Sequence, residues 1–312
     1  MTGYVLRRLA ALAPTLFIVS LVAFLALSAC PGDPARISLI MSTGNESPSL
    51  EAVDAERVRL GFDRPLPERY LAWLGRTLHG DLGYSIQTGR PVGEEIARAA
   101  AASGLLAATA MAVSLLLVLA CGVGAAILRG TLFDAAALLW SLLVGSMPDF
   151  FIALLAILAF AVHWHLLPVT GYGRPAALVL PALSLALSVS AVSARLMRTS
   201  MIQAMAGKFL VAARARGLSE RVVLGRHALK SAVAPVLSYL GAQLGFLFGG
   251  AAVIETLFVW PGLGRLLVES VRSRDAFVVQ GCVLAVAGAY AGINLVVDIL
   301  HAAVDPRIRH VA

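Results

Sequence analysis

Six long apolar runs are the feature that most constrains how this chain of 312 residues can fold. A helix rises about 1.5 Å per residue, so about 20 apolar residues cross the roughly 30 Å hydrocarbon core of a bilayer. Only 14% of the residues are charged, whereas soluble domains average about 25%. We therefore expect an all-α integral membrane protein with six transmembrane helices, in residues 9–29, 99–128, 135–162, 175–194, 231–254 and 276–297.

The Lys and Arg residues of the short connections predict the orientation of these helices. Arg7 and Arg8 precede the first run, Arg129 follows the second, and a strongly basic stretch separates the fourth from the fifth. Placing these cations in the cytoplasm puts both termini inside. The chain then divides into residues 1–30 (cytoplasmic N-terminus and first helix), 31–98 (an extracytoplasmic helical insertion), 99–304 (a core with five further helices) and 305–312 (a cytoplasmic tail).

The basic stretch, at about residues 195–230, holds eight Lys or Arg residues and a single acid, Glu220. We expect no nucleic-acid binding, because no zinc-finger, helix-turn-helix or RNA-binding signature accompanies it. Gly217 predicts the end of one short helix, Ser219 can cap a second, and Pro235 marks the start of the fifth run. The stretch is thus expected to form a protruding helical hairpin on the cytoplasmic side. Contact with membrane lipid would explain its charge but not its glycine turn.

Sequence motifs for catalysis are absent. The chain has no phosphate-binding loop of the form G-x-x-x-x-G-K-[ST], no G-x-S-x-G and no H-E-x-x-H. We expect no catalysis by this chain and no cofactor bound to it.

Polar residues within or beside the apolar runs are the remaining candidates for function. Asp149 follows Pro148 in the third run, where a proline bends a helix. Asp149, Met147 and Glu255 form our set of candidate pathway residues. The alternatives are a water-facing side chain for Asp149 and an interfacial position for Glu255.

Two other patterns predict structure more readily than chemistry. His163 and His165 are weak candidates for a metal site, because side chains two positions apart diverge on a helix and polar interfacial residues are the simpler interpretation. Gly241, Gly245 and Gly249 recur every four residues, which predicts a helix face that another helix approaches closely. The sequence leaves open whether that helix belongs to this chain.

Five segments together resemble one known family. The stretch ARARGLSERVVLGRHALKSAVAP is similar to the cytoplasmic loop of ABC-importer permeases of the peptide/nickel type. The other four, in the order of that family, are PGDPAR (31–36), HGDLGYSI (79–86), ETLFVWPGLGRLL (255–267) and DPRIRH (305–310). The chain is therefore identified as resembling a peptide/nickel-type ABC importer permease subunit.

The resemblance implies partners as well as a fold. It implies a second, usually non-identical permease, two cytoplasmic ATPases that bind ATP and Mg, an extracytoplasmic binding protein, and a place in a bacterial or archaeal cytoplasmic membrane. A coupling helix at about 207–217 would dock on an ATPase, although Val211 stands where the broader importer pattern often has Glu. The residues this implies for coupling are Phe209, Leu210, Ala212, Ala213, Arg214, Arg216 and Gly217.

The transported substrate stays open at this point. Peptides lead, because the resembled family is dominated by them, and nickel or a metal chelate is the alternative. An ion-coupled secondary transporter is the alternative of another class, since such proteins place ion ligands at broken helices. Asp149 beside Pro148 is the one hint of it.

Overall fold

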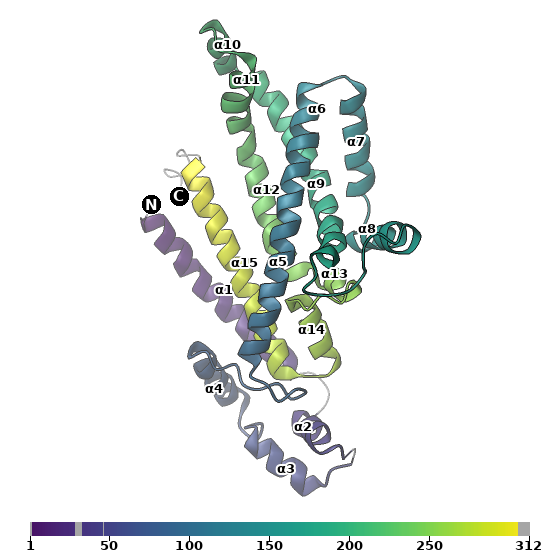
Figure 1. The fold of residues 1–312 in the computed structure, drawn as a ribbon. Coiled ribbons are helices and arrows are strands. Elements are labelled where there is room, and N and C mark those ends of the chain that lie inside the picture. Colours follow the sequence, from purple (N-terminus) through teal and green to yellow (C-terminus); the bar gives the residue numbers. More distant parts are fainter. Residues whose placement is uncertain (1, 29–32, 46, 305–312) are drawn as a thin grey trace.

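The computed structural model of the chain describes residues 2–28, 33–45 and 47–304 (Figure 1). Within these ranges it is built from helices, with an isolated β-bridge between Tyr84 and Pro91. The membrane-length helices are α1 (Thr2–Ser28), α5 (Val92–Leu117), α9 (Pro175–Met205), α12 (Leu229–Gly250) and α15 (Ala276–Val304). The shorter ones are α2 (Pro34–Thr43), α3 (Leu50–Arg59), α4 (Leu66–Leu78), α6 (Gly124–Ile127), α7 (Leu132–Gly145), α8 (Asp149–Ala156), α10 (Lys208–Ala215), α11 (Glu220–Val222), α13 (Ala252–Leu257) and α14 (Leu263–Arg272), with π-helical segments η1 (Val118–Val123), η2 (Ile157–His163) and η3 (Val223–Ala228).

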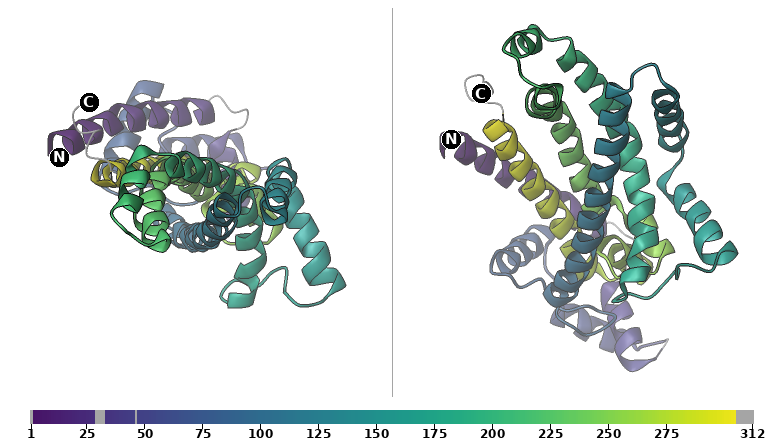
Figure 2. Two further views of the ribbon diagram at one scale, coloured as in Figure 1. Left: turned by 90° about the horizontal axis from the view of Figure 1, so that it is seen from above. Right: turned by 45° about the horizontal axis from the view of Figure 1, so that its top comes forward.

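The all-α membrane architecture expected from the sequence is confirmed. Five continuous helical segments are long and apolar enough to cross a membrane, and the bent pair of α7 and α8 makes a sixth if it counts as one span. The hairpin that carries α10 and α11 lies at one end of the molecule and the insertion with α2–α4 at the other, while the start of α1 and the end of α15 lie side by side (Figures 1 and 2).

Helix α9 lies at the centre of the bundle, between α5, α7, α8 and α12. Its buried face is rich in Ala and Ser, and small residues let neighbouring helices approach closely in a bilayer. Ser184 and Ser193 return their hydroxyl hydrogen bonds to carbonyls of α9 itself, and Ser114 of α5 donates to the Ala186 carbonyl oxygen at 3.1 Å. The buried hydroxyls of this face are therefore satisfied without water.

The third apolar run is broken more sharply than the bend that Pro148 predicts. Helix α7 ends at Gly145, helix α8 begins at Asp149, and the two are bent by 106°. Pro148 explains the break, because proline lacks an N–H to donate and disfavours helical backbone at the preceding Met147. The segment formed by α8 and η2 consequently leaves the bundle at a steep angle instead of continuing α7 (Figure 1).

The three regularly spaced glycines of α12 lie against α15 of the same chain. A Cβ atom built on Gly241 would lie 2.5 Å from a methyl group of Val297, one on Gly245 2.7 Å from the Tyr290 ring, and one on Gly249 2.5 Å from a methyl group of Val286. The glycine face thus sets how closely α12 and α15 approach.

The insertion between α1 and α5 is helical, as the sequence predicts, and contains α2, α3 and α4. Asp33 caps α2 by accepting from the Ala35 N–H at 3.1 Å and pairs with Arg57 of α3 at 2.6 Å. Helix α4 buries Tyr70 and Trp73 against Phe24 of α1. The insertion is therefore packed onto the end of the α1 and α15 pair.

Candidate functional site

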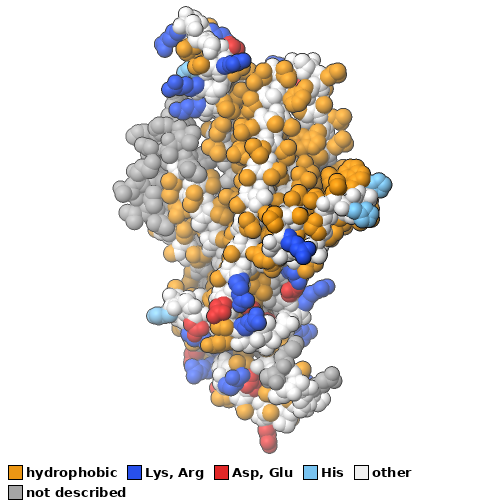
Figure 3. Space-filling view, viewed as in Figure 1, with side chains coloured by type: hydrophobic (Ala, Val, Ile, Leu, Met, Phe, Trp, Pro, Cys, Tyr) orange, Lys and Arg blue, Asp and Glu red, His pale blue; other side chains and the backbone are white. Residues whose placement is uncertain are grey.

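The hairpin at the end of the molecule is built on an overlong helix. Helix α9 has 31 residues, which is about 46 Å at 1.5 Å per residue and exceeds the roughly 30 Å hydrocarbon core. Its last turns therefore extend beyond the core and carry α10. Figure 3 shows Lys and Arg side chains gathered at this end of the molecule. The exposed cations of the hairpin are Lys208, Arg214, Arg216, Arg221, Arg226 and Lys230.

The turn of the hairpin depends on Gly217. Its φ is +78°, a left-handed value that side chains with a Cβ rarely adopt, and no atom lies within 4 Å of the position where a Cβ would stand. Backbone conformation, and not lack of space, is thus what requires glycine. Arg214 and Glu220 pair across the turn, with Nη2 to Oε1 at 2.7 Å and Nε to Oε2 at 3.2 Å. Both side chains are exposed, so the pair adds little stability.

Helix α10 has one face turned inward and one turned outward. Leu210 is fully buried and Ala213 nearly so, and both belong to the main apolar core together with Val223 of η3. Phe209 is 48% exposed and Val211 is 63% exposed. Of the seven residues implied by the resemblance, Leu210 and Ala213 therefore hold the hairpin to this chain, and a partner can reach Phe209, Ala212, Arg214, Arg216 and Gly217. Val211, which the resemblance does not place among the coupling residues, joins the exposed set.

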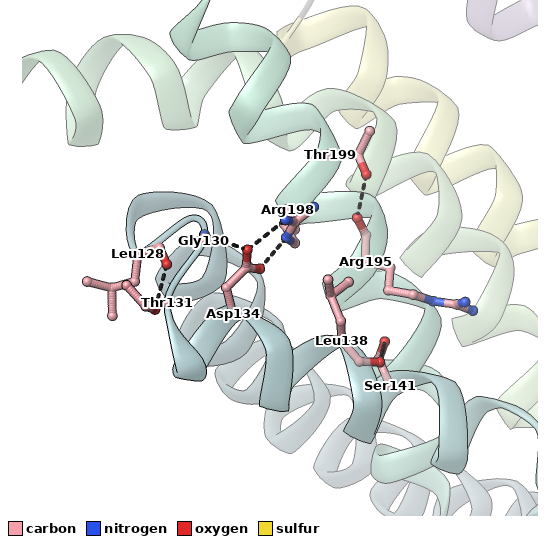
Figure 4. A network of polar contacts seen from close by, with 9 residues as sticks. All are labelled: Leu128, Gly130, Thr131, Asp134, Leu138, Ser141, Arg195, Arg198 and Thr199. Carbon is pink, nitrogen blue, oxygen red and sulfur yellow. Dashed lines mark hydrogen bonds and ion pairs between the residues drawn. The ribbon is translucent and has the colours of Figure 1, made fainter.

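A buried ion pair supports the base of the hairpin (Figure 4). Arg198 of α9 donates from Nε to Oδ1 of Asp134 at 2.5 Å and from Nη2 to Oδ2 at 2.8 Å, and Gly130 N–H donates to Oδ2 at 3.0 Å. Arg195, one turn earlier on α9, points away from this pair. Arg198 is thus not a free cation of the basic stretch but a link between α9 and α7. The sequence offered one signal for it, a lone acid at the start of an apolar run.

The break between α7 and α8 places Asp149 at the start of α8. Its Oδ1 accepts a hydrogen bond from the Ser188 hydroxyl of α9 at 2.5 Å. Asp149 is partly buried and Met147 lies in the break itself. The structure thus joins Asp149 to the middle of α9, with Met147 two residues away in the chain. Their role in transport stays a prediction.

Glu255 lies elsewhere, in a buried network behind α14. Its side chain is 1% exposed, and it accepts from the Ser103 hydroxyl and, at 3.0 Å, from Arg265 N–H in the first turn of α14. A Cβ on Gly262 would overlap the Glu255 carboxylate, so the glycine makes room for it. These contacts assign Glu255 a structural role as a cap of α14, where an anion stabilises the helix N-terminus. It does not meet Asp149 or Met147.

The remaining candidates from the sequence are the two histidines and two of the quoted segments. His163 and His165 are exposed, and His165 has a φ of 54°. Among the described residues no group of three or more His, Cys, Asp or Glu side chains could hold a metal ion. Residues 31–32 of PGDPAR and all of DPRIRH (305–310) lie outside the described residues.

Comparison with known proteins decides the family. Residues 117–310 match the model of the binding-protein-dependent transport system inner membrane component, and residues 1–98 match the model of the N-terminal part of such membrane components. The chain belongs to this family. It is a multi-pass inner-membrane permease of a binding-protein-dependent transport system, and the resemblance to peptide-type ABC importer permeases is confirmed.

Individual relatives align over the whole length of this permease. It is 39% identical over 310 residues to the glutathione transport system permease protein GsiC of Escherichia coli O6:H1, which covers 99% of this chain and 100% of that protein. It is 38% identical, with the same coverage, to the proteins of that name from Escherichia coli K12 and Shigella dysenteriae serotype 1.

Proposed function

We propose that this permease is one of two membrane subunits of an ATP-driven importer for small peptides, with glutathione as the first candidate substrate. The observation that carries the proposal is the 39% identity, over 99% of this chain, to a glutathione transport system permease protein. ATP and Mg bind to separate ATPase subunits, and a binding protein delivers substrate on the side of the insertion. Both termini and the hairpin lie in the cytoplasm.

The hairpin is the proposed contact with the ATPase. Its outward face combines the apolar Phe209 and Val211 with six exposed cations, a composition that favours a protein groove with acidic groups at its rim. Its inward face, through Leu210, is continuous with the core of the membrane bundle. Movement of the ATPase would therefore be transmitted to α9 and α12 only if the hairpin contacts the ATP-bound and ATP-free states differently.

Uptake by cells that express the complete transporter tests the substrate and the energy source. We expect accumulation of labelled glutathione that vanadate blocks and an uncoupler does not. Nickel uptake without peptide uptake would replace the proposed substrate by the metal alternative. Uptake that an uncoupler abolishes and vanadate spares would sink the ATP-driven mechanism, and attention would turn to Asp149 as an ion ligand.

The docking face can be tested separately with a matched pair of variants. Phe209→Ser and Leu71→Ser each remove an exposed apolar side chain, one from α10 and one from α4 at the opposite end. We expect Phe209→Ser to lower co-purification of the ATPase at least tenfold and Leu71→Ser to leave it unchanged. Equal retention of the ATPase by both variants would contradict the docking assignment without touching the substrate.

A further inference from the structure

A hollow at the end of the molecule opposite the hairpin has the chemistry of an anion-binding site. A pocket of about 390 Å³ lies between α3, α4 and the adjoining ends of α1 and α15. Its lining includes no Asp or Glu among the described residues, but it includes four arginines, Arg59, Arg64, Arg69 and Arg76. Asp63 and Glu68 neighbour this set in sequence, yet neither lines the pocket.

Three of the four guanidinium groups have no anionic partner. Arg59 is neutralised by Glu56, which it contacts twice at 2.6 Å. Arg64, Arg69 and Arg76 make no ion pair and no side-chain hydrogen bond within the described part of the chain. Each guanidinium carries five N–H donors arranged to meet a phosphate or carboxylate. The pocket therefore brings together positively charged N–H donors that have no acceptor in the described part of the protein.

Arg69 shows that the site is more than an exposed basic surface. Its guanidinium lies 4.6 Å from the centre of the Phe62 ring and 5.8 Å from that of Phe24. Burial lowers the pKa of Arg69, which reflects the cost of keeping this charge away from water. Contact with the aromatic faces offsets part of that cost, and an anion in the pocket would offset the rest.

The depth of the pocket matches the headgroup region of a bilayer. It is lined by Phe24, which is four residues before the end of α1, and by Ala276, the first residue of α15. The apolar span of α1 is Ala10–Ser28, so the pocket adjoins the end of that span, where the hydrocarbon core meets an interfacial layer about 5–7 Å thick. The four arginines belong to the insertion and not to the span. An anion bound here would therefore lie where lipid phosphates lie.

A separate apolar groove lies further along the same face of α15. A hollow of about 380 Å³ without charged side chains is lined by Val283, Ala287 and Tyr290 of α15, together with residues of α1 and α12. Ala276 and Gln280 of the arginine pocket and these three residues follow one another at spacings of four, three, four and three, which places them on one stripe of α15. A cationic pocket at interface depth and an apolar groove below it match the two parts of a phospholipid.

We propose that the pocket formed by Arg64, Arg69 and Arg76 binds the phosphate headgroup of an anionic phospholipid, with an acyl chain in the apolar groove beside α15. Bound lipid would join the insertion to the α1 and α15 pair through contacts that the protein alone does not make.

Native mass spectrometry of the full-length protein in a mild detergent tests this site. Phosphatidylglycerol and phosphatidylcholine are titrated in turn, and we expect the anionic lipid to bind at least tenfold more tightly. The triple variant Arg64→Gln/Arg69→Gln/Arg76→Gln should bind phosphatidylglycerol about a hundredfold more weakly, since each cation near a membrane surface contributes about 1 kcal/mol. The matched control Arg36→Gln/Arg174→Gln/Arg272→Gln removes the same charge from exposed positions outside the pocket and should bind as wild type.

Single variants and a competing anion distinguish a bound lipid from a bound soluble anion. Arg64→Gln and Arg76→Gln, made singly, change exposed side chains without hydrogen bonds, so they keep the fold and should each weaken binding several-fold. Equal binding of the two lipids, or equal weakening by the control triple, would overturn the proposal. Binding of inorganic phosphate at low-millimolar concentration, together with no preference for phosphatidylglycerol over phosphatidylcholine, would indicate a site for a soluble anion and would overturn the proposal.

Discussion

The proposed coupling function of the hairpin makes a prediction about the backbone at Gly217, whose φ is +78°. At Gly217 a valine would have to adopt a φ near +78°, which costs about 2 kcal/mol or more for a β-branched residue. We expect Gly217→Val to preserve membrane insertion but to uncouple ATP hydrolysis from uptake, because the turn would relax and re-aim the exposed face of α10. ATPase activity and substrate uptake in proteoliposomes provide the measurement.

The matched control for Gly217 is Gly217→Asn, since asparagine tolerates the left-handed region better than valine. It should retain most of the uptake. Equal loss in both variants would show that contact with a partner, and not backbone conformation, makes glycine necessary at this position.

The pair of Asp134 and Arg198 gives a residue-scale prediction about stability. Arg198→Leu leaves a carboxylate that is only 5% exposed without its partner, and breaking a buried pair in this way typically costs about 3–5 kcal/mol. We expect a lower unfolding temperature for Arg198→Leu and for Asp134→Leu. The double variant Asp134→Leu/Arg198→Leu should recover most of the loss. Additive losses in thermal unfolding would argue against a coupled pair.

The residues show what sequence reasoning could and could not reach. Gly217 was predictable, because a glycine between two helical stretches has few other uses. The contact of Asp134 with Arg198 was not, since 64 positions separate them, and a lone acid at the start of an apolar run does not say which cation pairs with it. Leu210 was assigned to coupling through the resemblance to the family's loop, and sequence likeness cannot tell a residue of this chain's own core from one that fills a partner's groove.

Among the elements, α12 and α15 form the closest approach that can be tested directly. A methyl group at Gly241 would lie 2.5 Å from both Val297 methyl carbons, and overpacking of this kind typically costs about 1–3 kcal/mol. We expect Gly241→Ala to destabilise the protein in thermal unfolding and Gly241→Ala/Val297→Ala to restore it. Gly292→Ala is the control, because no atom lies within 4 Å of its Cβ position. A neutral Gly241→Ala would mean that the two helices separate easily.

The stability of the insertion should depend on pH through the carboxyl group of Glu56. Hydrogen bonds from Arg59 first, and then from Ser38, hold the pKa of this carboxyl below its usual value near 4.5, against the opposing effect of burial. A lowered folded-state pKa means that the stabilisation is present above the unfolded value and is lost as the pH falls through the folded one. We expect protease cleavage of the insertion to accelerate below pH 4.5 in the wild type. Glu56→Gln should lack that component of the pH dependence. Identical cleavage-rate profiles against pH for the variant and the wild type would refute the role of Glu56.

The third apolar run shows what sequence reasoning could not predict for a whole element. Pro148 predicted a bend, but hydropathy could not distinguish one kinked span from two helices bent by 106°, because the same residues give the same hydropathy in both arrangements. The helical character of the insertion was predictable, since Gly61 and Pro65 separate two stretches of helical length. The bounds of α2 were harder to predict, because its apolar positions do not stand out beside the first span.

For the whole molecule, the two polar ends differ in kind. One end is the cationic hairpin, and the other is the insertion, where acids and bases mix and many are paired. We expect the basic end to lie in the cytoplasm, because translocating clustered Lys and Arg is disfavoured. If α7 and α8 together form one span, the number of crossings is six, and α1 would begin on the same side of the membrane on which α15 ends.

Site-directed labelling can measure this orientation. In a background with Cys30, Cys121 and Cys282 replaced, Arg216→Cys places a thiol on the exposed hairpin and Glu51→Cys places one on the exposed side of α3. A membrane-impermeant maleimide should label Glu51→Cys in spheroplasts and Arg216→Cys only in inside-out vesicles.

Addition of the ATPase subunits to those vesicles should then protect Arg216→Cys, because docking covers the hairpin. Labelling of both thiols from one side would overturn the topology. Labelling of Arg216→Cys that the ATPases leave unchanged would retain the topology and remove the hairpin from the interface.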